Sequence, residues 1–231
     1  MELIFHYGDP YQQILADGKR ITQPRSFIFG QIKQFIDIIP TGYSGIIAAR
    51  FLPDGLAPFL DRPATELDNK AVGLTDLFGQ EGIKLEYEVL KMQGLECKIS
   101  VIESFLLKLL KTSATPDNIT RSFVDTIVRA QGQVEVTDFL NTFHLKRRQL
   151  ERRFNSTIGV SPKQLAKIVR LQSTLKMLDQ KKFSSLTALA YENGYYDQAH
   201  FIRDFKEYSG FSPKAFFSDN LKYASLFTGT G

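Results

Sequence analysis

Two short stretches of the chain carry basic and amide side chains of the types that bind nucleic-acid bases. The first stretch contains Lys146, Arg147, Arg148, Gln149, Arg152 and Asn155. The second stretch contains Gln198, Ala199, His200, Arg203 and Lys206. Arginine suits guanine O6 and N7 in the major groove of DNA, and glutamine or asparagine suits adenine N6 and N7. A solvated basic helix face explains either stretch taken alone, so the placement of the two decides between these explanations.

The two stretches belong to one sequence unit that repeats at an offset of 51 residues. Each copy has an apolar residue, an arginine and a phenylalanine in the same register: Leu150, Arg152 and Phe154, then Phe201, Arg203 and Phe205. Each copy continues with Gly-x-Ser-Pro-Lys, at 159–163 and at 210–214. Serine caps the first turn of a helix and proline fits its first position, so a helix is predicted to begin at each Ser-Pro pair. An arginine repeated in register favours a shared binding role over a solvated surface.

Helical spacing predicts an inner and an outer face in each copy. At about 100° per residue, the apolar repeat residues turn inward and the repeated arginines turn outward. Another short helix is predicted before each copy, at 134–141 and at 185–193. A helix, a tight turn and a basic helix in succession are the helix-turn-helix pattern.

A long helix is predicted between the two copies, at 162–179. Its 18 residues span about 27 Å at a rise of about 1.5 Å per residue. Successive major-groove faces of DNA lie about 34 Å apart. One chain could therefore place two recognition helices in neighbouring grooves without dimerising.

Residues 119–218 resemble the AraC-type DNA-binding domain of bacterial transcription regulators. The second copy carries many residues of the family pattern: Leu189, Ala190, Gly194, Tyr195, Asp197, Gln198, His200, Phe201, Arg203, Phe205, Lys206, Gly210, Ser212 and Pro213. The first copy departs at its turn, where His144 and Lys146 replace the glycine and the serine cap usual in the family. The resemblance implies a sequence-specific transcriptional regulator that inserts two recognition helices into successive major grooves of double-stranded DNA. It also implies contact with RNA polymerase.

The first half of the chain predicts an α+β fold, a small sheet or partial barrel followed by helices. Strand-like runs bounded by turn residues lie at 2–7, 25–39 and 45–52, and helical spacing begins after residue 56. The segment 51–60, with Leu67 and residues 74–79, resembles an uncharacterised sensor-like domain that precedes AraC-type domains. That resemblance implies a small-molecule effector, leaves a homodimer open, and implies that the first strands of the domain are missing.

A boundary between the two halves is predicted at 112–117, a small, polar segment with a proline. The expected parts are a sensor-like domain at 1–114, an all-α DNA-binding domain at 115–219 and a tail at 220–231. The net charge also differs between the two halves of the chain. Residues 1–115 hold 12 Lys and Arg against 14 Asp and Glu, a net charge of −2, and residues 116–231 hold 17 against 11, a net charge of +6. A basic second half favours a polyanionic partner.

Composition excludes several other classes of protein. One cysteine, Cys97, and three histidines cannot supply a four-ligand zinc site, so we expect neither metal nor cofactor, and we expect Cys97 to be a small buried side chain. The absence of a long apolar run and of a signal peptide predicts a cytoplasmic protein that does not enter a membrane. No phosphate-binding loop, serine-hydrolase or zincin motif occurs, which argues against an enzyme. Two alternatives stay open: a DNA-binding module fused to a domain with enzymatic activity, and an architectural DNA binder.

Overall fold

The computed structural model describes residues 1–15, 17–110, 117–180 and 185–219. They form two compact units. The first comprises Met1–Ile32, Ile36–Asn118 and Arg153–Gly159, and the second comprises Lys33–Phe35, Ile119–Arg152 and Val160–Gly231. The predicted tail lies outside the described residues, and so does the predicted boundary apart from Asp117. The division of the chain at residue 114 therefore stays a prediction.

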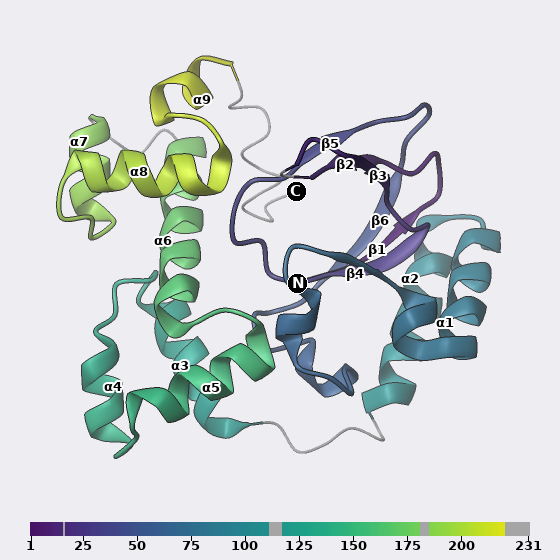
Figure 1. The fold of residues 1–231 in the computed structure, drawn as a ribbon, viewed down its shortest axis with the longest axis horizontal. Coiled ribbons are helices and arrows are strands. Elements are labelled where there is room, and N and C mark those ends of the chain that lie inside the picture. Colours follow the sequence, from purple (N-terminus) through teal and green to yellow (C-terminus); the bar gives the residue numbers. More distant parts are fainter. Residues whose placement is uncertain (16, 111–116, 181–184, 220–231) are drawn as a thin grey trace. The chain divides into compact units, whose positions relative to one another are not determined.

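Two antiparallel sheets make up the strand part of the first unit (Figure 1). The four-stranded sheet has the order β6 (Ile46–Arg50), β1 (Glu2–His6), β4 (Ser26–Phe29) and β7 (Ala71–Gly73). The three-stranded sheet has the order β3 (Arg20–Thr22), β2 (Gln12–Ile14) and β5 (Asp37–Ile39). Strands β1 and β4 have a neighbour on each side, and nearly every residue in them is buried. This central pair is the base on which the rest of the unit packs.

Two helices, α1 (Leu74–Lys91) and α2 (Leu95–Leu110), pack on the four-stranded sheet through the apolar faces that the sequence predicts. The shared core consists of buried side chains from β1, β4 and both helices: Leu3, Phe5, Ile28, Leu74, Leu85, Val89, Ile102 and Phe105. Single-turn helices at Ala57–Phe59 and Ala64–Leu67 lie between β6 and β7 in the chain. The predicted α+β character of this half is confirmed.

The structure differs from the sequence predictions at several short elements and at the cysteine. Strands β2, β3 and β7 are not predicted, because three residues are too few to show an alternating pattern. The run at 25–39, which the sequence left open as one strand or two, contains two strands, β4 and β5. The expectation for Cys97 is wrong, since this thiol is exposed. Cys97 lies about 140° around α2 from the buried Ile102, which places it on the outer face of the helix.

Apart from the short segment Lys33–Phe35, the described part of the second unit consists of helices and their connections. Its helices are α3 (Asn118–Arg129), α4 (Val136–Thr142), α5 (Arg147–Ile158), α6 (Pro162–Asp179), α7 (Leu186–Glu192), α8 (Gln198–Ser209) and α9 (Pro213–Asp219). The second half of α5, from Arg153, belongs to the first unit. The helices predicted at 134–141, 162–179 and 185–193 are confirmed as α4, α6 and α7. Among the described helices, none combines the length and the apolar character needed to cross a membrane.

Both Ser-Pro pairs begin a helix as predicted. The Ser161 hydroxyl accepts a hydrogen bond from the backbone N–H of Gln164 at 3.2 Å. In return, the Gln164 Oε1 accepts one from the Ser161 backbone N–H at 3.0 Å, which completes a capping box for α6. The Ser212 hydroxyl accepts from the Ala215 N–H at 3.2 Å at the start of α9. The long helix thus has a firmly fixed first residue.

A histidine at the end of β1 is fully buried in the first unit. The His6 Nε2 lies 3.2 Å from the Gln23 Oε1, and the ring packs on Tyr11 and Phe27. Within the described residues, the His6 Nδ1 has no hydrogen-bond partner. Burial lowers the pKa of His6, the Gln23 hydrogen bond opposes this shift, and the charge of Arg25 adds to it. The folded state therefore favours the neutral imidazole.

We expect this histidine to make stability depend on pH. The unfolded chain takes up a proton at His6 near its ordinary pKa of about 6.5, whereas the folded chain resists protonation, so the free energy of unfolding falls as the pH drops below that value. The variant His6→Gln removes the titrating group. Its unfolding free energy, measured by chemical denaturation between about pH 8 and pH 5, should fall less steeply than that of the wild type.

The exposed His144 provides the matched control. The variant His144→Gln should keep the pH slope of the wild type, because it leaves the buried His6 in place. Equal slopes for the wild type and His6→Gln would show that the burial of His6 does not control this pH dependence.

Candidate nucleic-acid interface

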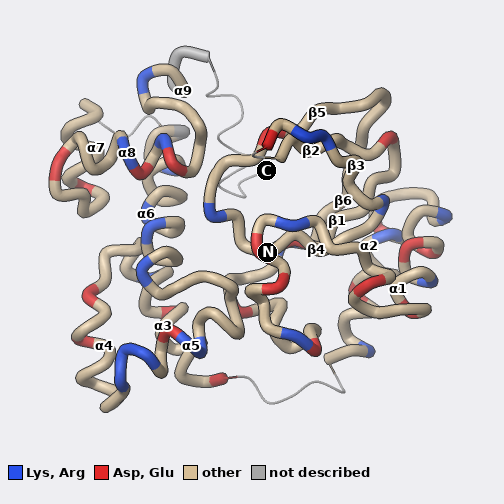
Figure 2. Tube along the Cα trace, in the orientation of Figure 1, with Lys and Arg blue, Asp and Glu red and all other residues tan. Residues whose placement is uncertain are grey.

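Helices α5 and α8 each bury one face and expose the other. The inward residues of the repeat are fully buried: Leu150, Phe154, Phe201 and Phe205. The predicted base-reading residues are exposed on or just before the same helices: Lys146, Arg147, Arg148, Gln149, Arg152 and Asn155, then Gln198, Ala199, Arg203 and Lys206. His200 is half-buried. Figure 2 shows the run of basic residues where α5 begins, and basic residues mixed with acidic ones along α8.

The turns before the two helices have the same backbone geometry. His144 has a φ of 50° and Gly194 a φ of 70°, both in the left-handed region. The next residue donates a backbone hydrogen bond five residues back in each case, from Leu145 to Leu140 at 2.9 Å and from Tyr195 to Ala190 at 3.0 Å. The histidine found where the family usually has glycine thus adopts the conformation that glycine favours. The first helix-turn-helix is complete despite its unusual turn.

The two recognition helices begin with different caps. The Asp197 carboxylate accepts from the His200 backbone N–H at 2.6 Å. At the corresponding position, Lys146 has no acceptor in its side chain. The Gln149 Oε1 instead accepts from the Lys146 backbone N–H at 3.1 Å. The start of α5 is therefore stabilised by a residue within the helix. Bidentate binding of adenine requires both ends of an amide, so Gln149 would have to release this bond to read a base.

Some polar residues of the two helices have protein partners. The Gln198 Oε1 accepts from the Thr187 hydroxyl at 3.2 Å, which joins α8 to α7. The Arg153 Nη1 lies 2.8 Å from the Asp117 Oδ2, and Arg153 is half-buried. Arg153 therefore serves the structure, whereas Arg152 beside it is exposed.

Sequence reasoning missed a buried carboxylate on α8. Asp204 is only 3% exposed, and its Oδ1 lies 3.1 Å from the Lys167 Nζ of α6. Its Oδ2 lies 3.3 Å from the His200 Nε2, one turn earlier on α8. Lys167 also lies 3.2 Å from Glu207. Asp204 lies about 60° around the helix from the buried Phe201. This position beside the apolar face is the signal by which the sequence could have revealed it.

This ion pair connects the long helix to the second recognition helix. Burial alone would lower the pKa of Lys167, but the hydrogen bonds to Asp204 and Glu207 outweigh burial and raise it. An apolar cluster joins the same two helices and includes Leu171 and Leu175 of α6 and both phenylalanines of the repeat in α8. The cluster and the ion pair together fix α8 on α6. His200 shares in this contact, so its Nε2 faces Asp204.

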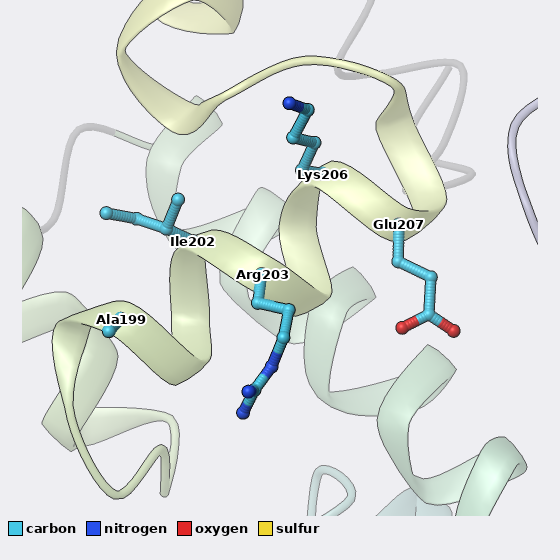
Figure 3. A pocket seen from close by; sticks show the side chains of 5 residues that line it. All are labelled: Ala199, Ile202, Arg203, Lys206 and Glu207. Atoms are coloured by element: carbon cyan, nitrogen blue, oxygen red, sulfur yellow. The ribbon is translucent and has the colours of Figure 1, made fainter.

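The outer face of α8 carries a shallow hollow (Figure 3). Its lining is Ala199, Ile202, Arg203, Lys206 and Glu207. In Figure 3, Arg203 and Lys206 extend from the helix in opposite directions, and Ala199 and Ile202 lie toward its N-terminal end. Apolar and cationic groups therefore meet on one open surface.

Two protein families match parts of the chain. Residues 140–219 match a helix-turn-helix domain, which confirms the resemblance of this half to the AraC-type domain. Residues 1–73 match a domain of unknown function (DUF6597), the uncharacterised domain expected ahead of it.

Individual proteins agree with these matches. An uncharacterized HTH-type transcriptional regulator of Haemophilus influenzae is 39% identical over 72 residues, which is 31% of this chain and 24% of that protein. The chain thus matches about a quarter of the length of this relative. A crystal structure of ToxT from Vibrio cholerae O395, bound to (E)-4-(8-methylnaphthalen-1-yl)but-3-enoic acid, is 14% identical with a TM-score of 0.51, and the match covers 98% of this chain and 90% of that one. This likeness confirms the fold class, sheets followed by a helical region.

The turn geometry predicts opposite effects at its two equivalent positions. A side chain in the left-handed region costs about 1–2 kcal/mol, while a new glycine costs about 0.4–1 kcal/mol in unfolded-state entropy. His144→Gly should therefore raise the free energy of unfolding by up to about 1 kcal/mol. Gly194→Ala should lower it by about 1–2 kcal/mol, as its added Cβ would also meet the Gln133 side chain at 2.6 Å. Chemical denaturation measures both changes.

The variant His144→Ala separates this cause from the loss of the imidazole. It keeps a Cβ at a positive φ and should bring no gain in stability. If His144→Ala stabilises the protein as much as His144→Gly does, the backbone conformation is not the reason.

The ion pair predicts a large effect of a single charge. Lys167→Met leaves the nearly buried Asp204 without its ammonium partner, which should lower the free energy of unfolding by about 3 kcal/mol. Lys176→Met removes an exposed charge from the same helix and should change it by less than about 0.5 kcal/mol. Similar losses in both variants would contradict the role of the pair.

Proposed function

We propose that this chain, which carries an AraC-type helix-turn-helix domain, is a sequence-specific DNA-binding transcriptional regulator. One observation supports this most strongly. Two helices in one chain bury an apolar pair at the same register, and each exposes an arginine, Arg152 or Arg203, at the same register. A single basic helix face is common on protein surfaces, whereas a repeated one behind two turns of matching backbone geometry fits the helix-turn-helix mode of DNA recognition.

Binding divides between the phosphates and the bases. Lysine and arginine side chains at the rim of the interface, such as Lys146 and Arg147, neutralise phosphates and release counterions. This contribution gives affinity and register without sequence preference. Residues farther along the outer faces reach base edges: Arg148, Gln149, Arg152 and Asn155 from α5, and Gln198, Ala199, Arg203 and Lys206 from α8. His200, whose Nε2 faces Asp204, would reach a base only through its other ring nitrogen.

The length of α6 supports the use of two successive grooves. Its 18 residues span about 27 Å along the helix axis. The separation of successive major-groove faces is about 34 Å, and the width of the motifs adds to the span of the helix. One chain then covers two half-sites on one side of the duplex, in the bacterial cytoplasm where the DNA lies.

Regulatory input is proposed for the first unit. The ToxT structure, which has the same fold class, holds a small carboxylic acid. A small-molecule effector bound to the first unit, with RNA polymerase as the partner of the DNA-bound protein, completes the proposal.

The two repeated arginines predict separate losses of specificity. An arginine that binds guanine through both nitrogens discriminates between bases by about 1–3 kcal/mol. Arg152→Ala and Arg203→Ala should therefore each remove the preference at a different position of the site, about one helical turn apart. The measurement is selection of binding sites from random duplexes at one salt concentration, for the wild type and each variant.

A charge control makes the result specific. Lys84→Ala removes an exposed positive charge from α1 of the first unit and should leave every preferred base in place. If both arginine variants keep every preferred base and lose only overall affinity, these arginines bind phosphates and the assignment of base-reading residues is wrong.

A further inference from the structure

The outer faces of the two recognition helices differ in chemistry although they share a register. At the offset of 51 residues, Arg148 corresponds to Ala199 and Glu151 corresponds to Ile202. The flanking positions stay polar in both copies, with Arg152 and Arg203 as the common element. The outer face of α5 therefore presents charged groups where the outer face of α8 presents a methyl group and an isoleucine.

Ile202 is not needed by the core of its own unit. It is 36% exposed. Within the described residues, the apolar cluster that fixes α8 to α6 and α7 includes Phe201 and Phe205 but not Ile202. Isoleucine is also a weaker helix former than the long polar side chains usual on a solvated helix face. Ile202 is thus an apolar side chain left partly open to solvent beside the basic residues of α8.

The neighbours of Ile202 indicate what kind of ligand would bind beside it. Ala199 lies three residues earlier, so both apolar groups lie on one side of α8. Both line the same hollow as Arg203 and Lys206 (Figure 3). Glu207, the carboxylate among the lining residues of the hollow, is paired with Lys167 of α6. A ligand of this surface must therefore offer an apolar group next to negatively charged or hydrogen-bond-accepting groups, which Arg203 and Lys206 would bind.

Thymine in the major groove meets this description. It is the base that carries a methyl group there, and apolar side chains recognise it by contact with that methyl. Phosphates and guanine acceptors in the same groove supply the groups that Arg203 and Lys206 bind. We infer that Ile202, with Ala199 beside it, contacts the 5-methyl group of a thymine next to the guanine bound by Arg203. This inference rests on the proposed function and adds a specificity residue to it.

The consequence is that the two half-sites are read by different chemistry. The α8 half-site contains a thymine recognised by its methyl group, whereas the α5 half-site is read by hydrogen bonding alone. Removal of one methyl group should then matter at one half-site only.

The test removes the methyl group from the DNA and the apolar contact from the protein separately. Deoxyuridine replaces each thymine, in turn, in the site that the wild type selects. The full chain should lose about fourfold in affinity at one thymine of the α8 half-site, the effect expected for one buried methyl group. Ile202→Ala should bind the thymine and the deoxyuridine duplexes with equal affinity at that position.

Two control variants define the contact. Ile202→Val keeps a β-branched apolar side chain and should retain most of the preference for thymine. Val128→Ala shortens an exposed apolar side chain on α3 and should retain all of it. Thermal unfolding of each variant checks that the fold is intact.

The outcomes separate this inference from the proposed function. If the wild type selects a defined site but tolerates deoxyuridine everywhere, or if Ile202→Ala still distinguishes the two duplexes, the inference is wrong and the regulator proposal stands. If Ile202→Ala binds DNA like the wild type but fails to activate or repress a reporter, the surface serves a protein partner and the inference is wrong. If no site is selected at all, both the inference and the proposed function fail.

Discussion

The anchoring of helix α6 is the constraint on which the functional arrangement depends. Near its middle, the Arg170 Nη2 donates to the Gly132 carbonyl at 2.9 Å, just after α3. The Lys167 ammonium binds Asp204 of α8, and an apolar cluster joins the same two helices. These contacts tie α6 to the end of α3 and to α8. The proposal that one chain binds two successive grooves depends on α6 keeping the two helix-turn-helix motifs apart.

The two helix-turn-helix motifs share a backbone geometry but expose different side chains. The turns at His144 and Gly194 have the same hydrogen bonds and the same left-handed backbone, which gives both recognition helices a similar starting direction. With this shared geometry, α5 exposes charged and amide groups and α8 exposes an apolar pair beside its arginine. Two unlike half-sites would give the protein a defined direction on the duplex, because binding in the reverse orientation would mismatch both.

The sequence was informative where a pattern recurs and silent where structure depends on contacts between distant residues. The repeat, the Ser-Pro helix starts and the bounds of α6 could all be predicted, because caps and apolar spacing are local properties. The short strands β2 and β3 depend on partners elsewhere in the sheet, and Asp204 is buried only because Lys167 meets it. The exposure of Cys97 follows from which face of α2 packs on the core, which composition alone does not determine. The direct base contacts stay predictions, since they depend on the DNA itself.

The spacing between the two half-sites gives the most direct test of this arrangement. Inserting five base pairs into the selected site turns one half-site by about half a helical turn, and inserting ten restores its face but moves it about 34 Å farther away. A rigid α6 predicts that both insertions reduce the affinity to that of a single half-site. Full affinity with the ten-base-pair insertion would show a flexible connection, and full affinity with both insertions would show that only one recognition helix binds DNA.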